Sequence, residues 1–285
     1  MGRARARGRG RSGEHHRVIA PRHSENAVGA LARQWSAAGV ESGTTMLLHS
    51  NITRTLRTCR RVAGRVSVED VLESLLAALG PGGTLLLPLF NFGFTKGLPF
   101  DIRDTPSEMG VLTEAGRKHP GAVRTGHPIY SFAAIGGQAE RFRGVDNVSG
   151  FGDDSPFAIL RALDGTVAAL DLDEQSSMTF YHHVEELKRE PYRYFKEFTG
   201  TYSDWDGVSS TRTYRLYVRD VDRGVTGEGN PASHMMWERG LYRGDRPGVG
   251  SGLRTIKARA MFDFLADLID TDRALGTMYS IKQTT

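Results

Sequence analysis

Hydrophobic positions alternate between helical and strand-like spacing along the first 190 residues. Apolar side chains recur at positions 68, 71, 72, 75, 76 and 79, which is the spacing of one helical face. Ser67 and Asp70 form a capping-box pattern before this face, and Gly80 ends it. Two largely apolar runs, 84–87 and 166–172, are typical of buried strands. Further strands at 45–49 and 131–135, and helices at 24–38, 109–118 and from 155, complete an alternation that predicts a layered α/β fold with a central sheet.

The C-terminal third follows a different pattern. Residues 211–218 alternate polar and apolar side chains, as a half-exposed strand does. The Gly-rich stretch 224–231 is expected to be a loop, and 256–269 an amphipathic helix. The sequence shows no repeat of fixed period and no clear linker. We therefore expect one domain that spans residues 23–285.

Positive charge is concentrated at the N-terminus. Residues 1–22 hold seven arginines and one glutamate, a net charge of +6, whereas the whole chain carries +4, so the remainder carries −2. The arginines alternate with Gly and Ala without apolar periodicity, which predicts a disordered basic tail. Such an arm can bind nucleic acid, but it has no aromatic residue to stack on bases. We favour a leader without a binding role, or a misassigned start codon, and keep a non-catalytic nucleic-acid-binding protein as an alternative.

Composition narrows the class of protein. Hydrophobic residues make up 39% and charged residues 25%, which is ordinary for a globular protein. No apolar run approaches the roughly 20 residues of a membrane helix, and the N-terminus lacks the apolar segment of a secretory signal. The single cysteine, Cys59, excludes an internal disulfide and a multi-cysteine metal site. We therefore expect a cytoplasmic protein without a membrane partner.

The run 179–186 carries the strongest chemical pattern. If it opens a helix after the strand 166–172, Thr179, His182 and Glu185 fall on one stripe. Open α/β sheets bind ligands where strands end and helices begin. A neutral imidazole, with an ordinary pKa of ~6.5, can take a proton from an attacking amine near pH 7. Glu185 or its neighbour Glu186 would orient the ring, and Thr179 would donate to a developing oxyanion.

Non-catalytic interpretations of these residues compete with the proposed catalytic role. His182 and Glu185 could form only an exposed surface pair, and His183, about 100° around the helix, is expected to be a packing or surface residue. The His and Glu spacing fits neither zinc helix pattern, so we expect no metal. Cys59 lies among arginines that could lower the pKa of its thiol and make it a nucleophile. An incidental thiol is favoured, because no base stands beside it.

Three further clusters are open to two interpretations each. One cluster is basic and could either contact phosphates or form a solvated face; it consists of Arg54, Arg57, Arg60 and Arg61. Acidic residues could attract a cationic acceptor or be ordinary surface acids; these are Asp171, Asp173, Glu174, Glu185 and Glu186. Aromatic residues beyond them belong to the core or wall an acceptor pocket; these are Tyr192, Tyr194, Phe195, Phe198, Tyr202 and Trp205.

Short motifs follow one another in a specific order from about residue 42 onward. They lie at 48–50, 81–88, 99–101, 105–114, 120–124, 127–128, 131–136, 151–157, 179–185 and 248–250. In this order the chain resembles the aminoglycoside 3-N-acetyltransferase family and its relatives in natural-product biosynthesis. Two stretches depart from the family pattern. The segment 170–178 replaces a glycine-rich strand end and places Met178 before Thr179, and the pair Ser50-Asn51 replaces two serines.

The resemblance implies a fold and a reaction. The fold would be the antibiotic N-acetyltransferase α/β/α sandwich with a central mixed sheet, distinct from the small GNAT acetyltransferase fold. The reaction would be acetyl transfer from acetyl-CoA to an amine of an aminoglycoside or a related intermediate. The thioester would lie near Thr179 and His182, and direct attack would need no covalent enzyme intermediate. The pantetheine arm of the CoA thioester would contact Ser50, Asn51, Ser107, His127, Ser131 and Ser155.

Two points stay open at this stage. The departures touch the acceptor pocket most, so a different acyl or one-carbon donor and a biosynthetic amine, such as a nucleotide-linked one, form the alternative within the same scaffold. The oligomeric state is also open, and a homodimer is one option.

Overall fold

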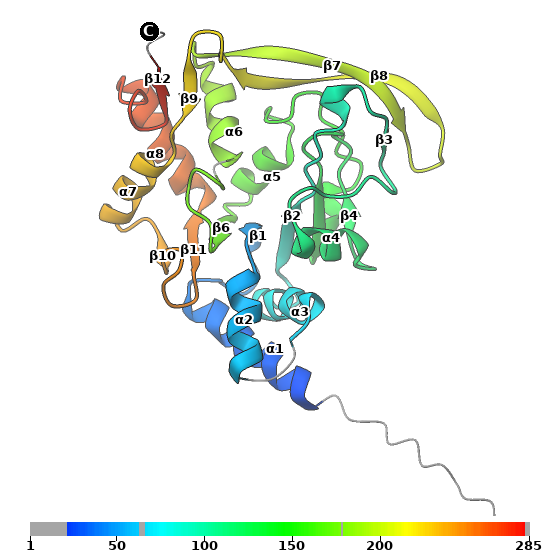
Figure 1. Ribbon diagram of the computed structural model, residues 1–285, viewed down its shortest axis with the longest axis vertical. Helices are drawn as coiled ribbons and strands as arrows, with labels where there is room; N and C mark the ends of the chain where they lie inside the picture. Colours follow the sequence, from blue (N-terminus) through cyan, green and yellow to red (C-terminus); the bar gives the residue numbers. More distant parts are fainter. Residues whose placement is uncertain (1–21, 63–65, 178, 283–285) are drawn as a thin grey trace, which may run out of the picture.

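The computed structural model describes residues 22–62, 66–177 and 179–282 (Figure 1). Residues 1–21, nearly all of the predicted basic tail, and Met178 lie outside the described residues. Within the described part, the core of the fold is a seven-stranded sheet in the order β10-β11-β6-β1-β2-β5-β4. The strands are β1 (Thr45–Ser50), β2 (Thr84–Pro88), β4 (Val123–Arg124), β5 (Phe132–Gly136), β6 (Thr166–Leu170), β10 (Arg243–Gly244) and β11 (Leu253–Lys257).

Strand direction makes this sheet mixed, as predicted. β1 runs parallel to both of its neighbours, β2 and β6. The outer strands β5, β4, β11 and β10 pair antiparallel. Because β1, β2 and β6 are parallel, their carboxyl ends meet at one edge of the sheet, and the segments that follow them are brought together there.

Helices cover both faces of the sheet, so the layers are α/β/α. Successive side chains of a strand point to opposite faces, and β1 shows this directly. Met46 and Leu48 pack with the helices of one face, whereas Leu47 packs with those of the other. The first face carries α1 (Arg22–Ala37), α2 (Thr53–Val62), α3 (Val68–Leu79) and α4 (Val111–Lys118); the second carries α5 (Pro156–Ala162), α6 (Thr179–Lys188) and α8 (Ala258–Asp270).

Local sequence signals explain where α3 begins. The Ser67 hydroxyl accepts a hydrogen bond from the Asp70 amide at 3.0 Å. The Asp70 carboxylate in turn accepts one from the Ser67 amide at 2.8 Å. This capping box satisfies two amides that a helix start leaves unpaired, and it confirms the pattern in the sequence.

A long hairpin crosses the edge of the sheet where the parallel strands end (Figure 1). It consists of β7 (Arg193–Ser203) and β8 (Ser209–Arg219), which pair antiparallel along their whole length. The short strand β3 (Phe100–Asp101) joins the far end of β7. β7 follows α6 after a four-residue connection, so the hairpin starts beside the helix that carries His182.

Three sequence predictions in the C-terminal third need correction. The strand predicted at 211–218 is β8, but its partner β7 was not predicted. The stretch 224–231 is not all loop, because it contains β9 (Val225–Gly227), paired with β12 (Tyr279–Ile281), and the first residues of α7 (Asn230–Glu238). The helix predicted to begin at 256 begins at Ala258, since Ile256 pairs with Val167 in the sheet.

The remaining described elements are two short 3₁₀ helices, Phe94–Lys96 and Ala139–Phe142. Among the described residues, none of the helices has the length and apolar character that crossing a membrane requires.

Candidate active site

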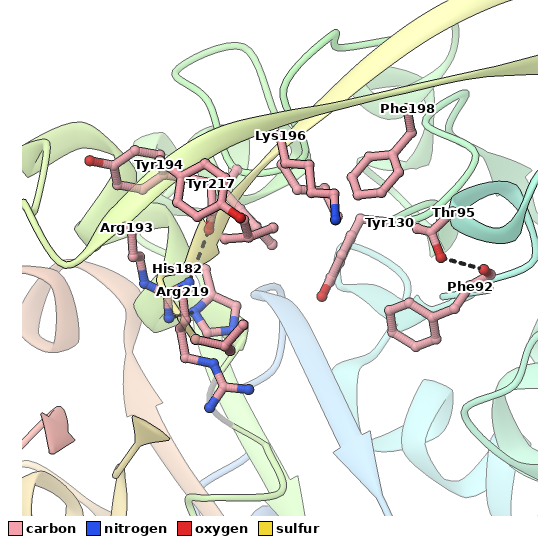
Figure 2. A pocket seen from close by; sticks show the side chains of 14 residues that line it. Phe92, Thr95, Tyr130, His182, Arg193, Tyr194, Lys196, Phe198, Tyr217 and Arg219 are labelled. Atoms are coloured by element: carbon pink, nitrogen blue, oxygen red, sulfur yellow. Dashed lines mark hydrogen bonds between the residues drawn. The ribbon is translucent and has the colours of Figure 1, made fainter. Parts of the chain in front are cut away.

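His182 lies on α6 and points toward the underside of the β7–β8 hairpin (Figure 2). Its Nδ1 atom lies 2.8 Å from Glu185 Oε2, one helical turn further on. The structure therefore brings together the His and Glu that the sequence spacing places on one stripe. The ring packs edge-on against Phe151, with the centroids 5.1 Å apart, and its side chain remains 19% exposed.

The Glu185 carboxylate is fully buried and is held by three donors. Besides His182, the Arg193 guanidinium donates to Oε2 at 2.8 Å and the Tyr192 hydroxyl donates to Oε1 at 2.7 Å. Burial acts to raise the pKa of Glu185, but the Arg193 charge and these hydrogen bonds outweigh it and lower the pKa to about 2. The carboxylate is therefore ionised at neutral pH and fixes the orientation of the ring.

The environment keeps His182 neutral. Burial lowers the pKa of the ring, and the nearby Arg193 charge lowers it further, against the opposing effect of Glu185. We assign the ring proton to Nδ1, where the ionised Glu185 carboxylate accepts it, which leaves the lone pair of Nε2 free. Within the described residues Nε2 has no hydrogen-bond partner, so it is available to a molecule in front of it.

A pocket of about 450 Å³ lies in front of this ring (Figure 2). Its volume is in the range of small-molecule sites. The hairpin forms one wall, and Phe92, Thr95 and Tyr130 form the other. Tyr194 and Phe198 line it, so part of the aromatic cluster in the sequence does wall a pocket, whereas Tyr192 and Tyr202 are buried.

Thr179 lies one turn before His182 but does not line this pocket. Its hydroxyl shares a 2.8 Å hydrogen bond with Nε2 of His49, a residue of β1. Burial lowers the pKa of His49 to about 4, and the Arg254 charge contributes, so this ring is neutral. Sequence reasoning missed His49 as a site residue. Its place in the 48–50 motif was the available signal, but it was taken only as the end of a strand.

The residues expected near the pantetheine arm lie outside the pocket. Ser50 ends β1 and is half-buried. Asn51 is exposed and its side chain accepts from the Thr53 amide at 3.1 Å. The Ser107 hydroxyl lies 2.9 Å from that of Thr113. A role for these three in donor binding stays a prediction.

The other three expected donor contacts are fully buried. His127 Nδ1 accepts from the amides of Ile129 and Tyr130 at 3.2 and 3.0 Å. Ser155 caps α5, and Ser131 lies in the core beside β5. These side chains hold loops in this structure, and their contact with a donor also stays a prediction.

The acidic residues do not gather into one surface. Glu174 pairs with Arg254 at 2.9 Å, and both side chains are only 2% exposed. Asp171 pairs with Arg54 at 2.9 Å, and the Glu186 carboxylate accepts from the Ser149 hydroxyl at 2.7 Å. Internal partners occupy four of the five acids, which favours the interpretation that they have structural roles, whereas Asp173 is exposed.

The surroundings of Cys59 and His183 indicate the roles of these two residues. Cys59 is half-buried on α2, and burial raises the pKa of its thiol, which favours the incidental thiol over the alternative of a nucleophile activated by nearby arginines. His183 is fully buried and its Nδ1–H donates to the Phe151 carbonyl at 2.7 Å, which makes it a packing residue. No cluster of three or more His, Cys, Asp or Glu side chains within residues 22–62, 66–177 and 179–282 is arranged to hold a metal ion.

Comparison with known protein families gives a long match. The model of the family described as aminoglycoside 3-N-acetyltransferase matches residues 47–269. Aminoglycoside N(3)-acetyltransferase VII of Streptomyces paromomycinus is 31% identical over 192 residues, which are 59% of this chain and 63% of the relative. Aminoglycoside N(3)-acetyltransferase IV of a Salmonella species is 33% identical over 161 residues, 54% of this chain and 56% of that protein. These matches span about three fifths of the relatives' length.

Solved structures share the fold over most of the chain. The crystal structure of aminoglycoside acetyltransferase AAC(3)-Xa has a TM-score of 0.71 at 26% identity, covering 87% of this chain and 95% of that one. AAC-IIIb, in a binary complex with CoASH, has a TM-score of 0.70 at 22% identity, covering 86% and 96%. These likenesses confirm the expected antibiotic N-acetyltransferase fold.

Proposed function

The chain belongs to the aminoglycoside 3-N-acetyltransferase family, and on that basis we propose that it transfers the acetyl group of acetyl-CoA to an amine. The acceptor is an aminoglycoside, the class that the relatives' names give, or a related natural-product intermediate. One observation carries the proposal: His182 is oriented by Glu185 at 2.8 Å while its other nitrogen remains free in front of a pocket of about 450 Å³.

In this proposal His182 is the general base. The amine nitrogen attacks the thioester carbonyl, and Nε2 takes the proton that the nitrogen loses as the N–C bond forms. The tetrahedral intermediate then collapses, the C–S bond breaks, and the departing thiolate receives a proton from the imidazolium. The ionised Glu185 stabilises that imidazolium between the two proton transfers. The acetyl group moves directly to the amine without an acyl-enzyme.

Thr179 is proposed to stabilise the oxyanion. A hydroxyl can donate only if its proton is not already used. We assign the proton of the neutral His49 ring to Nε2, which then donates to the Thr179 oxygen at 2.8 Å. The Thr179 proton is left to donate to the carbonyl oxygen as negative charge develops on it. His49 would thus act as a positioning residue for Thr179.

The donor is proposed to approach past the end of β1, where Ser50 and Asn51 lie. AAC-IIIb is a family-fold neighbour whose structure contains CoASH, which supports a CoA thioester as donor. This route leaves the hairpin side of His182 to the acceptor.

Replacing His182 tests the proposal. His182→Ala should reduce kcat by about 10²–10⁴-fold, the usual contribution of a general base, while CoA binding persists. The assay follows free thiol release from acetyl-CoA in the presence of a panel of amines. His234→Ala is the matched control, because His234 is an exposed histidine of α7 paired only with Glu238, and it should keep wild-type rates. If His182→Ala retained most of its kcat, the base assignment would be refuted.

A further inference from the structure

The pocket in front of His182 is positively charged. Among the described residues that line it, three side chains are cationic, Arg193, Lys196 and Arg219, and none is a carboxylate. Glu185 compensates Arg193 at 2.8 Å. Neither Lys196 nor Arg219 forms an ion pair with any described carboxylate, and the Lys196 ammonium lies 5.7 Å from the Phe198 ring. The pocket therefore has two cations whose charge is not neutralised.

The alternation of β7 determines which charges face the pocket. Tyr194, Lys196 and Phe198 line the pocket, two residues apart, as the side chains on one face of a strand are. Glu197 lies between them in the sequence and does not line the pocket; it pairs in register with Arg215 on β8. The middle of β7 thus presents Lys196 to the pocket and keeps Glu197 out.

Aromatic side chains enclose the same space. Phe92 and Tyr130 form the wall opposite the hairpin, and Figure 2 shows Lys196 reaching toward Tyr130 between these walls. Tyr194 and Phe198 complete the enclosure from β7. Aromatic walls favour a planar ring by stacking.

We infer that the acceptor of this enzyme is an amine that also carries a planar ring and a negatively charged group, a phosphate or a carboxylate, attracted by the unpaired cations Lys196 and Arg219 that line the pocket. The inference rests on the proposed function and narrows its acceptor to an anionic intermediate. An aminoglycoside carries several ammonium groups, and like charges brought into one site oppose binding. If the donor approaches past the end of β1, as proposed, the pocket that these cations line is left to the acceptor.

Matched small amines test the choice of acceptor. O-Phosphotyramine and tyramine share an amine and a ring and differ by a phosphate, while 4-(2-aminoethyl)benzoate and phenethylamine differ by a carboxylate. We expect kcat/KM for each anionic amine to exceed that of its neutral partner by about tenfold or more, and to exceed that of kanamycin. Calorimetric titration of O-phosphotyramine and tyramine into the protein, without acetyl-CoA, should show the same order of affinity.

Charge reversal identifies the residues that hold the anion. Lys196→Glu and Arg219→Glu should each bring the phosphotyramine-to-tyramine ratio to one or below, whereas Lys196→Arg should keep it. Lys196 is exposed, so its replacement leaves the packing of the fold in place. Arg141→Glu is the control for net charge, because Arg141 is an exposed residue away from the pocket, and it should leave the ratio unchanged. The KM for acetyl-CoA should stay within about twofold in every variant.

The outcomes of these experiments distinguish a failure of the anionic acceptor from a failure of the proposed acetyl transfer. If kanamycin were acetylated with the highest kcat/KM, the anionic acceptor would be wrong while the acetyl transfer stood. If Lys196→Glu and Arg219→Glu raised the KM for acetyl-CoA and left the amine ratio unchanged, the cations would bind the phosphates of the donor, and the inference would be overturned. If the protein neither bound CoA nor released thiol with any amine, the proposed function would fail. In that case calorimetry would still test the preference for an anionic amine, and equal affinities for O-phosphotyramine and tyramine would refute that preference.

Discussion

Removing the Arg193 charge should shift the pH dependence of the enzyme. Arg193 NH2 lies 3.0 Å from His182 Nδ1, and its charge lowers the pKa of that ring. The base must be neutral to accept a proton, so kcat/KM should rise with pH through the pKa of His182. In the wild type this rise should lie below the ordinary histidine pKa of ~6.5. Arg193→Gln removes the positive charge, raises the pKa of His182 and moves the rise to higher pH.

Coulomb's law sets the size of the shift. Two unit charges 4 Å apart interact by about 4 kcal/mol at an effective dielectric constant of about 20, and 1.36 kcal/mol corresponds to roughly one pKa unit. The direct effect of the Arg193 charge on the pKa of His182 is therefore about three units. Water that enters the space left by Arg193 screens part of it, and we expect a shift of about one to two units.

The assay is kcat/KM for one acceptor measured from pH 5 to 9, which reports ionisations of the free enzyme. Because the same amine is used for each variant, its own ionisation cancels from the difference. Arg193→Lys is the matched control: it keeps the charge but loses the second donor that binds the Tyr217 carbonyl at 2.9 Å. Its profile should stay near that of the wild type. A rise that stayed in place or moved to lower pH in Arg193→Gln would refute the electrostatic account.

Two further predictions concern residues on either side of this network. Thr179→Ala should lower kcat by about 10²–10³-fold, the usual effect of losing an oxyanion donor, while Thr179→Ser keeps most of the rate; equal rates in steady-state assays would contradict the role. Cys59→Ala should leave kcat unchanged, because burial raises the pKa of the thiol and makes it a poor nucleophile. A large loss of thiol release in that variant would reopen the covalent route.

The sequence indicated the proposed base, His182, and the Glu185 that orients it, but not the residues around them. His182 and Glu185 are three positions apart on one helix, so local geometry alone predicts their contact. Arg193 and Tyr192 reach the same carboxylate from the far side of a helix end, and no spacing rule connects them to it. Arg193 was missed because β7 was not predicted, and Tyr192 was named only as a member of the aromatic cluster. The exposed side chains of β7 follow no simple alternation of polar and apolar residues.

The seven-stranded sheet was easier to predict than the hairpin for a related reason. Buried strands such as β1 and β6 are continuous apolar runs, and their identity follows from burial. The pairing of the acidic residues could not be predicted from the sequence. Glu174 and Asp171 are close in sequence, yet each is neutralised by an arginine at least 80 residues away, Arg254 and Arg54. Charge pairing over such separations depends on the fold and is invisible to local patterns.

A single continuous segment, 179–219, supplies both the proposed base and one wall of the pocket in front of it. α6 provides His182 and Glu185. Arg193, the first residue of β7, pairs with Glu185 and lowers the pKa of the His182 ring. The next residues of β7 that face the pocket, Tyr194 to Phe198, follow at every second position. Because alternate residues face away, the pocket face can change without disturbing the hydrogen bonds around Glu185. The same chemistry could therefore be directed to acceptors of opposite charge by substitution at a few alternating positions of one strand, while the base and its orienter remain as they are.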